Sequence, residues 1–405
     1  MSKPPELARR MQSIAPSATA EIFKRVAELR AQGVAIVSLS VGEPDFEPPL
    51  HVRDAAKRAL DTGPFGYTSV AGLAELREAI CERSAVRRGV KHAPNEVVVG
   101  AGAKHALFNL AQALYEPGDE VLIPTPSWVS YAEQANLCGA TPVLLPCDAR
   151  DDFLLTPSAL AAAFTPRTKA LVLCSPSNPT GFTYSAAQLR ALADVLKQRS
   201  IWVIVDEIYA ELCYGDAGAA GSAPSLLSVA PELREQLVIV DGVSKSYAMT
   251  GFRVGWLLAP PALARACEIV QSQATTSVAT VAQLAAIAAL RGDQTCVKQM
   301  RDTYAARRDH IVQGLAAIPG VACGTPTGAF YALADVRALL GKKLAGVPLA
   351  TDLDFARALL DRERVAVVPG SAFHAPGYLR LSYAASNADI DAALARLASL
   401  VASLS

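Results

Sequence analysis

Two cationic side chains, Lys245 and Arg253, stand eight positions apart in the stretch GVSKSYAMTGFRVGW (242–256), where an apolar run has just ended. A lysine in such a place is either a solvated charge at the end of a strand or an amine nucleophile held beside a bound anion. The arginine close behind it favours the second interpretation, because a guanidinium binds phosphate or carboxylate through paired hydrogen bonds. The stretch therefore points to amine chemistry next to an anion site.

Further polar residues follow other short apolar runs of the chain. AGAKHA (101–106) follows EVVVG, SNPTG places Asn178 in a proline-stiffened loop, and Asp206 ends IWVIVD with Tyr209 three residues on. In an open α/β sheet, ligands bind beyond the carboxyl ends of the strands. Each feature alone has a structural explanation, as a turn, a helix cap or a solvated charge. Their occurrence at successive strand ends favours a ligand site.

The turn AGAKHA (101–106) is the first part of an expected phosphate site. The free N–H groups and the dipole of a helix N-terminus attract anions, and Ser244 and Arg253 add a hydroxyl and a guanidinium. The turn is no Walker A loop, and it fails the G-x-G-x-x-G pattern because His105 occupies the last position. We expect His105 to be a packing or hydrogen-bonding residue.

An amine, a carboxylate and a phosphate cradle together match the chemistry of pyridoxal phosphate. Lys245 would form the Schiff base, and Asp206 would keep the pyridine nitrogen protonated so that the ring accepts electrons. Asn178 and Tyr209 would hydrogen-bond the phenolic oxygen of the ring. Once substrate has displaced it, Lys245 is a free amine placed to move the Cα proton.

SNPTG, DEIY and SKSYAMTGFRVGW, in this order and spacing, resemble the motifs of class I, fold-type I aminotransferases, and most closely the bacterial aspartate aminotransferase subgroup Iβ. The resemblance extends from PSAT (16–19) and VGEPDF (41–46) to RLSYA (380–384). It implies an enzyme that moves an amino group from an L-amino acid, with aspartate or glutamate favoured, to a 2-oxo acid, 2-oxoglutarate or oxaloacetate. A ping-pong mechanism through pyridoxal phosphate is implied, with no metal.

The resemblance also assigns roles to individual residues. Lys245, Asp206 and Tyr209 are implied to be catalytic, and Arg380 to grip the substrate α-carboxylate bidentately. An arginine in the apolar strand YLRLSYA is already unusual, because burying it unpaired is costly. The remaining positions implied to contact cofactor or substrate are Gly42, Gly102, Ala103, Lys104, Trp128, Asn178, Ser244, Arg253 and Tyr67.

Three of these positions carry more specific expectations. Tyr67, in FGYTSVAG, is implied to reach the phosphate of a neighbouring subunit, so a homodimer with shared active sites is expected. Trp128, in PSWVSY, is implied to stack on the cofactor ring, with a core aromatic as the alternative. Lys104 is implied to recognise the distal carboxylate of acidic substrates; the alternative is a solvated charge, which opposes the helix dipole only weakly.

Alternatives within the fold are a broad aromatic, methionine or kynurenine aminotransferase, a prephenate aminotransferase and a C–S lyase. Prephenate-using relatives carry a basic residue before PSAT, where this chain has Ala15. Phe252 replaces a usual tryptophan, and His105 a usual glutamine. A ligand-sensing regulator would need an appended DNA-binding domain, and fifteen residues precede PSAT. A nucleotide-binding Rossmann enzyme leaves Lys245, Arg253 and Arg380 without a role.

The elements that must position these residues follow an α/β pattern. Short apolar runs alternate with amphipathic segments, which is typical of parallel strands covered by helices. The expected strands are 96–100, 120–124, 140–146, 169–175, 201–207, 236–242 and 254–259. Long helices are expected over 261–317. From 318 onward the pattern predicts a strand pair, then a helix and strand, then a strand and a final helix.

This pattern predicts an α/β fold with two domains, and the resemblance implies that it is the PLP-dependent transferase fold type I. We expect an N-terminal arm (1–15), a small α+β domain (16–50 and 291–405) and a large cofactor-binding domain (51–290). The large domain is expected to hold a mostly parallel, seven-stranded sheet between helices.

Composition narrows the class of protein. Hydrophobic residues make up 51 % and charged residues 19 %, which indicates a packed globular chain. Lys plus Arg equals Asp plus Glu at 38 each, which argues against a nucleic-acid partner. No run approaches the roughly 20 apolar residues of a membrane span. The eight cysteines are scattered, as expected for reduced cytoplasmic thiols, and the five histidines form no ligand cluster.

Overall fold

The computed structural model describes residues 6–12, 14, 18–218 and 221–405. Much of the expected arm, 1–15, therefore lies outside the described residues. The same holds for Ala15, on which the expectation about prephenate rests, and for the start of PSAT.

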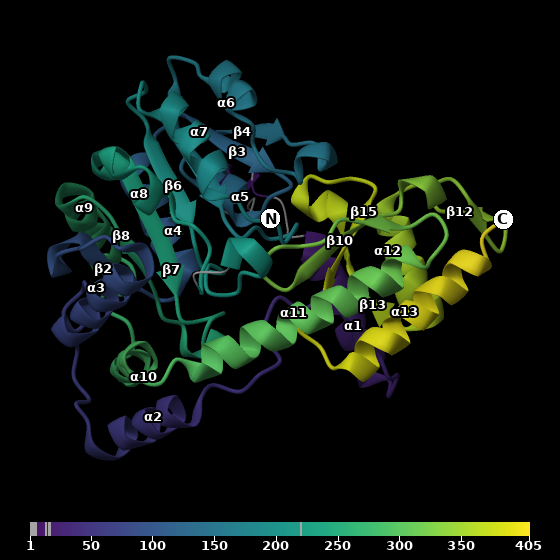
Figure 1. Ribbon diagram of the computed structural model, residues 1–405, viewed down its shortest axis with the longest axis horizontal. Coiled ribbons are helices and arrows are strands. Elements are labelled where there is room, and N and C mark those ends of the chain that lie inside the picture. Colours follow the sequence, from purple (N-terminus) through teal and green to yellow (C-terminus); the bar gives the residue numbers. More distant parts are fainter. Residues whose placement is uncertain (1–5, 13, 15–17, 219–220) are drawn as a thin grey trace, which may run out of the picture.

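A seven-stranded sheet occupies one half of the molecule (Figure 1). Its strand order is β2-β8-β7-β6-β5-β3-β4, and β3 to β7 are parallel to one another, whereas β8 runs antiparallel to both β2 and β7. The predicted mostly parallel sheet is confirmed. The strands are β2 (Val97–Gly100), β3 (Glu120–Thr125), β4 (Thr141–Pro146), β5 (Thr168–Cys174), β6 (Trp202–Asp206), β7 (Leu237–Gly242) and β8 (Gly255–Leu258).

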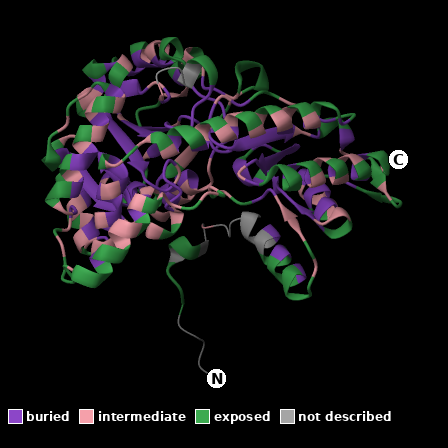
Figure 2. Cartoon of the chain, turned by 60° about the horizontal axis from the view of Figure 1, so that its bottom comes forward, coloured by how far each residue is buried: buried purple, intermediate pink, exposed green. Residues whose placement is uncertain are grey.

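Helices cover both faces of this sheet, so most of its strands are buried (Figure 2). The exception is the edge strand β4, whose residues are exposed or half-buried. Successive side chains alternate between two hydrophobic clusters: Val97 and Val99 join one cluster, and Val98 joins the other. Fully burying such side chains contributes roughly 1.5–3 kcal/mol each. One face packs on α4 (Ala103–Leu114), α5 (Ser130–Leu137) and α9 (Pro261–Ser272). The other packs on α2 (Leu50–Thr62), α3 (Ala74–Arg88), α6 (Pro157–Ala163), α7 (Ala186–Leu196), α8 (Leu226–Val229) and α10 (Thr280–Arg291).

The second half is built around a four-stranded antiparallel sheet of order β14-β15-β10-β9. The expected strand pair, helix and strand, and closing strand and helix all form. Its elements are α11 (Thr295–Ala316), β9 (Ala322–Cys323), β10 (Tyr331–Asp335), β11 (Lys343–Leu344), β12 (Val347–Pro348), α12 (Asp352–Glu363), β13 (Val365–Ala366), β14 (Val368–Pro369), β15 (Tyr378–Ser382) and α13 (Asn387–Ala402). Thr351 caps α12, and its side chain accepts from the N–H of Asp354.

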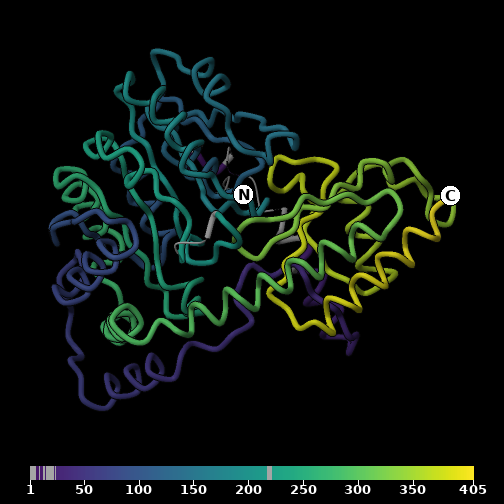
Figure 3. Tube along the Cα trace, viewed as in Figure 1, coloured from purple at the N-terminus to yellow at the C-terminus, as the bar shows by residue number. Residues whose placement is uncertain are grey.

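The N-terminal segment returns to this second half, as the chain trace shows (Figure 3). Helix α1 (Ala18–Ala31) contributes Ile22 and Val26 to a hydrophobic cluster shared with α12 and α13. Strand β1 (Val37–Ser38) pairs in parallel with β13. This shared cluster supports the small domain that we propose from 16–50 and 291–405.

Short 3₁₀ helices connect the larger elements. They are η1 (Arg9–Gln12), η2 (Pro94–Glu96), η3 (Ala149–Asp151), η4 (Gly215–Gly218), η5 (Pro231–Gln236), η6 (Thr250–Phe252), η7 (Arg337–Leu339) and η8 (Gly370–Phe373). Within the described ranges, no helix combines the length and the apolar character that crossing a bilayer requires.

Candidate active site

The carboxyl ends of three neighbouring strands bring the predicted residues together. In the register of the sheet, Cys174 of β5 is opposite Asp206 of β6, and Asp206 is opposite Val240 of β7. The loops that carry Asn178 and Lys245 leave β5 and β7 at this same edge. Parallel strands end on one side of a sheet, so residues far apart in sequence become neighbours here.

Lys245 is half-buried at this edge. Its Nζ donates a hydrogen bond of 2.7 Å to the carbonyl oxygen of Gly42 and lies 6.0 Å from the centroid of the Tyr209 ring. Burial lowers the pKa of Lys245 to about 8, although the charge of Glu43 opposes this shift. Desolvation disfavours an ammonium, so a neutral, nucleophilic amine is accessible near physiological pH.

Asp206 is 3 % exposed at the end of β6. One of its carboxylate oxygens accepts a hydrogen bond of 2.8 Å from the hydroxyl of Tyr131, and the other accepts from the N–H of Ile208 at 3.2 Å. Burial raises the pKa of Asp206 to about 6, and these hydrogen bonds partly oppose the rise. No described cationic side chain forms an ion pair with it, so a ligand cation would be its natural partner.

An anion cradle forms where α4 begins. Gly102 is the N-cap of α4 with φ of +89°, and a Cβ there would lie 2.5 Å from Nη2 of Arg253. A Cβ on Gly255 would lie 2.3 Å from the backbone nitrogen of Ala103. These two glycines therefore let the Arg253 guanidinium and the helix N-terminus approach each other closely. Ser244 is buried in the loop after β7.

The guanidinium of Arg253 has few partners of its own. It donates to the carbonyl oxygens of Thr250 at 3.0 Å and of Ala101 at 3.3 Å, and its side chain is exposed. Two positive elements, a guanidinium and the first turn of α4, thus meet at one place. A phosphate suits such a pair.

Arg380 is buried in β15 at 5 % exposure. Its Nη1 donates to Oδ1 of Asn178 at 3.1 Å, and its Nη2 donates to the carbonyl oxygen of Ser40 at 2.7 Å. Its Nε has no hydrogen-bond partner, and no carboxylate of the described chain pairs with it. Burial lowers its pKa from the ordinary value. A buried cation without an anion is costly, so this guanidinium fits a carboxylate ligand.

Trp128, in the loop before α5, lies next to Lys104 in the first turn of α4. The Nζ of Lys104 is 4.7 Å from the centroid of the Trp128 ring, and that ring packs edge-on against Tyr131 at 5.5 Å. Burial, followed by the charge of Arg253, lowers the pKa of Lys104. Trp128 is half-buried and packs at the margin of a core cluster.

Tyr67 is the predicted residue that the single chain does not bring to the others. It is 95 % exposed and makes no hydrogen bond to the described part of the chain. Phe65 and Leu60, nearby in sequence, are 76 % and 63 % exposed. Exposed large apolar side chains that gather in one segment are typical of an interaction surface.

Three neighbours of the site were missed from the sequence: Tyr131, Tyr331 and Phe373. Tyr131 follows Trp128 by three residues, and this i, i+3 spacing is the one signal that connects it to the site. Tyr331 lies 2.9 Å from Tyr209, hydroxyl to hydroxyl, and its ring lies over the Arg380 guanidinium. Nothing local in GAFYALAD sets this tyrosine apart from an ordinary core residue.

His105 accepts a hydrogen bond of 3.1 Å from the N–H of Ala101, in line with the expectation of a hydrogen-bonding residue.

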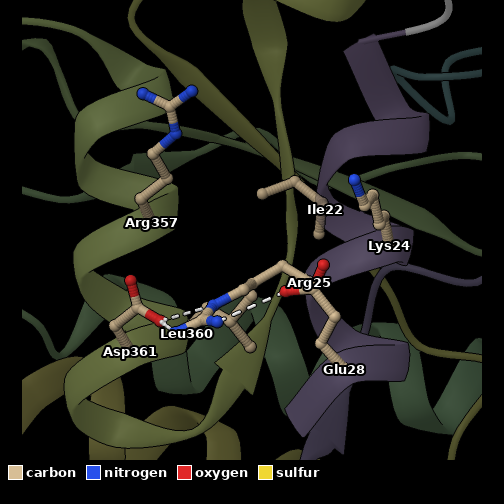
Figure 4. Close-up of a pocket in the computed structure, with 7 residues that line it drawn as sticks. All are labelled: Ile22, Lys24, Arg25, Glu28, Arg357, Leu360 and Asp361. Carbon is tan, nitrogen blue, oxygen red and sulfur yellow. Dashed lines mark hydrogen bonds and ion pairs between the residues drawn. The ribbon is translucent and has the colours of Figure 1, made fainter.

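A separate groove of about 330 Å³ lies between α1 and α12 (Figure 4). Its walls include Ile22, Arg25 and Asp361, and Arg25 donates to Asp361 at 3.1 Å. None of the residues that line it belongs to the candidate active site.

Known proteins share this arrangement over nearly the whole chain. Residues 34–397 match the family described as aminotransferase class I and II. An aspartate aminotransferase of Geobacillus stearothermophilus is 43 % identical over 392 residues, which cover 97 % of this chain and 98 % of that protein. An aspartate/prephenate aminotransferase of Nitrosomonas europaea is 39 % identical over 399 residues, covering 98 % and 100 %.

A solved structure gives the same result. The crystal structure of the aspartate aminotransferase from Rhizobium meliloti is 41 % identical, covers 99 % of this chain and 100 % of its own, and has a TM-score of 0.95. The seven-stranded sheet, the smaller second half and these matches lead to one conclusion. This chain belongs to the class I and II aminotransferase family.

Proposed function

We propose that this enzyme is an aspartate aminotransferase that uses pyridoxal phosphate. It would transfer the amino group of aspartate or glutamate to 2-oxoglutarate or oxaloacetate. The single observation that carries the proposal is the buried guanidinium of Arg380, which has no carboxylate partner among the described residues. The same site holds the amine of Lys245. The names of relatives at about 40 % identity support the choice of acidic substrates.

The residues fit pyridoxal phosphate on three counts. A Cβ on Gly102 would clash with the Arg253 guanidinium, so this glycine lets the guanidinium approach the N-terminus of α4, and the two together suit a phosphate. Asp206 is a buried carboxylate with no cationic partner among the described side chains, which suits a protonated pyridine nitrogen. Burial lowers the pKa of Lys245 to about 8, which makes the neutral amine that attacks an aldehyde more accessible than in an ordinary lysine.

When bound, the cofactor supplies an electron sink for the charge left at Cα after proton removal. Asp206 would hold the proton of the ring nitrogen, with Tyr131 fixing the orientation of its carboxylate. Asn178 and Tyr209 would hydrogen-bond the phenolic oxygen. Arg380 would bind the α-carboxylate and orient the Cα–H bond toward Lys245, which would carry the proton between substrate and cofactor.

A panel of amino donors with 2-oxoglutarate as acceptor tests the substrate class, and aspartate should give the highest kcat/KM.

Lys104 is the residue that we propose for selectivity toward acidic substrates. Lys104→Ala should lower kcat/KM for aspartate about tenfold or more and change that for phenylalanine by less than about threefold, because an ammonium contributes about 1.5–3 kcal/mol to a hydrogen-bonded carboxylate. Equal losses for both donors would contradict this role. Activity with prephenate as acceptor would identify a prephenate aminotransferase. Release of pyruvate from cysteine conjugates would identify a C–S lyase.

The lowered pKa of Lys245 predicts how cofactor capture depends on pH. At a pKa of about 8, roughly a tenth of the amine is neutral at pH 7, compared with about 0.03 % for an ordinary lysine. Only the neutral amine attacks an aldehyde. Capture of pyridoxal phosphate by the apoprotein, followed by stopped-flow absorbance, should therefore accelerate about tenfold from pH 6 to 7 and level off above 8.

A free lysine analogue with a blocked α-amine provides the control for this measurement. Its amine keeps an ordinary pKa, so its rate should go on rising to pH 10. If the rate of capture by the apoprotein also goes on rising to pH 10, the pKa of Lys245 is not lowered in the way that its burial indicates.

We also propose a homodimer with shared active sites. The argument rests on Tyr67, which is 95 % exposed in the single chain, and on the exposed apolar side chains near it in sequence. In such a dimer, Tyr67 would contact the phosphate held in the neighbouring subunit. The cytoplasmic location remains a prediction from the scattered thiols.

A further inference from the structure

Tyr331 contacts both sides of the candidate active site. It is the first residue of β10 and is 1 % exposed. Its hydroxyl oxygen lies 2.9 Å from that of Tyr209, and its ring centroid lies 4.6 Å from Cζ of Arg380. Tyr331 therefore contacts both Tyr209, which we propose to bind the cofactor, and Arg380, which we propose to bind the substrate.

The antiparallel pairing of β10 with β15 fixes the contact between Tyr331 and Arg380. In this register Tyr331 is opposite Ser382, so Tyr331 and Arg380 are diagonal neighbours on one face of the sheet. A second ring, that of Phe373, lies 4.9 Å from the same Cζ. Aromatic faces attract a guanidinium and restrict its rotation, which matters most where no carboxylate holds it.

The hydroxyl of Tyr331 has a different partner from its ring. Either hydroxyl can donate in the pair with Tyr209, and both side chains are buried. If Tyr209 donates its proton to a ligand oxygen, its own oxygen is left to accept the proton of Tyr331. Hydrogen bonds that follow one another in this way strengthen each other. Gly42 keeps this place open, because a Cβ there would lie 3.0 Å from the Tyr331 hydroxyl.

Building on the proposed function, we propose that Tyr331 is a positioning residue with two separable parts. Its hydroxyl holds Tyr209 as a hydrogen-bond donor to the phenolic oxygen of the cofactor. Its ring, together with that of Phe373, holds the Arg380 guanidinium in the orientation that receives the substrate carboxylate.

Three variants separate these two parts: Tyr331→Phe, Tyr331→Leu and Phe373→Leu. The first removes only the hydroxyl, the second removes hydroxyl and ring, and the third removes the other ring. Two quantities are measured on protein loaded with pyridoxal phosphate. They are the apparent pKa of the visible absorption band and the Kd of succinate, a dicarboxylate that has no amino group to react.

Tyr331→Phe should raise the apparent pKa of the band by about half a unit to one unit, because the loss of one hydrogen bond weakens the donor to the phenolic oxygen. Its Kd for succinate should stay within about twofold of the parent value. Tyr331→Leu should show the same shift of the band, and its Kd should rise about 5- to 30-fold. Phe373→Leu should raise the Kd without moving the band.

Two results would overturn the inference. One is an unchanged band in Tyr331→Phe; the other is a Kd for succinate that rises as much in Tyr331→Phe as in Tyr331→Leu. Because phenylalanine keeps the shape of the buried ring, the test survives even if the leucine variant folds poorly. A parent protein that captures no pyridoxal phosphate or transfers no amino group would overturn the proposed function instead. An active parent with indistinguishable Tyr331 variants would overturn only the role of Tyr331.

Discussion

Lys245→Ala is expected to lose the visible absorption of the lysine-bound cofactor and to lower kcat by at least about 10³-fold. Two functions disappear together in this variant: the covalent attachment of the aldehyde, and the transfer of the Cα proton by a positioned base, which alone contributes about 10²–10⁴-fold. The two guanidiniums near this amine, those of Arg253 and Arg380, cannot replace it, since they do not act as bases at neutral pH.

The matched control for this variant is Lys298→Ala. Lys298 is exposed on α11 and pairs with Asp302 at 2.6 Å, so its loss should leave both absorption and turnover unchanged. A small primary amine added to Lys245→Ala should restore part of the activity, because it can supply the missing base. Borohydride reduction followed by peptide mapping should place the label on Lys245 in the parent protein. Turnover in Lys245→Ala close to that of the parent would refute the mechanism.

Arg380→Leu is expected to lower kcat/KM by about 10²- to 10³-fold for every amino donor. Truncating one partner of a buried charge pair costs about 2–5 kcal/mol, and here that pair forms when substrate carboxylate binds. The loss should appear mainly in KM and in the Kd of succinate. Selectivity between aspartate and phenylalanine should change little, because both carry the same α-carboxylate.

Stability provides an independent readout for the same variant. Arg380 is buried without a carboxylate partner in the described chain, and burial lowers its pKa. Replacing such a cation by an apolar side chain removes its desolvation cost, so the free energy of unfolding of the apoprotein should not fall. Arg337→Leu is the matched control: Arg337 also lies over a ring, that of Tyr378, but already pairs with Asp335. It should leave kcat/KM unchanged, and equal losses in both variants would contradict the role of Arg380.

The sequence was sufficient to predict the fold class and the edge of the sheet where the polar residues gather. All seven expected strands of the large sheet form. Strands buried on both faces appear as continuous apolar runs, although the edge strand β4 is only partly buried. Asp206 and Lys245 are recognisable because each interrupts such a run at its carboxyl end. The motifs SNPTG and SKSYAMTGFRVGW each carry their chemical groups within a short stretch of sequence.

The partners of these residues could not be predicted, because they come from distant parts of the chain. Tyr131 reaches Asp206 from α5, 75 positions away, and Tyr331 reaches Tyr209 from 122 positions away. Neither residue lies in a local pattern that distinguishes it from a core tyrosine. The role proposed for Tyr67 would depend on a second chain, which no reading of local patterns can supply.

By itself, then, the sequence determined which residues are chemically able to act and on which strands they lie. Periodicity and strand-end polarity are local properties, so they can be recognised along the chain. Only the tertiary structure decided how far each of these residues is buried and how its pKa is shifted. Packing from β6, β7, β10 and β15 encloses Lys245, Asp206 and Arg380. Burial lowers the pKa of the lysine and raises that of the aspartate. The arginine has no carboxylate partner among the described residues. Desolvation depends on everything that surrounds a group, so it exists only once the distant segments have come together.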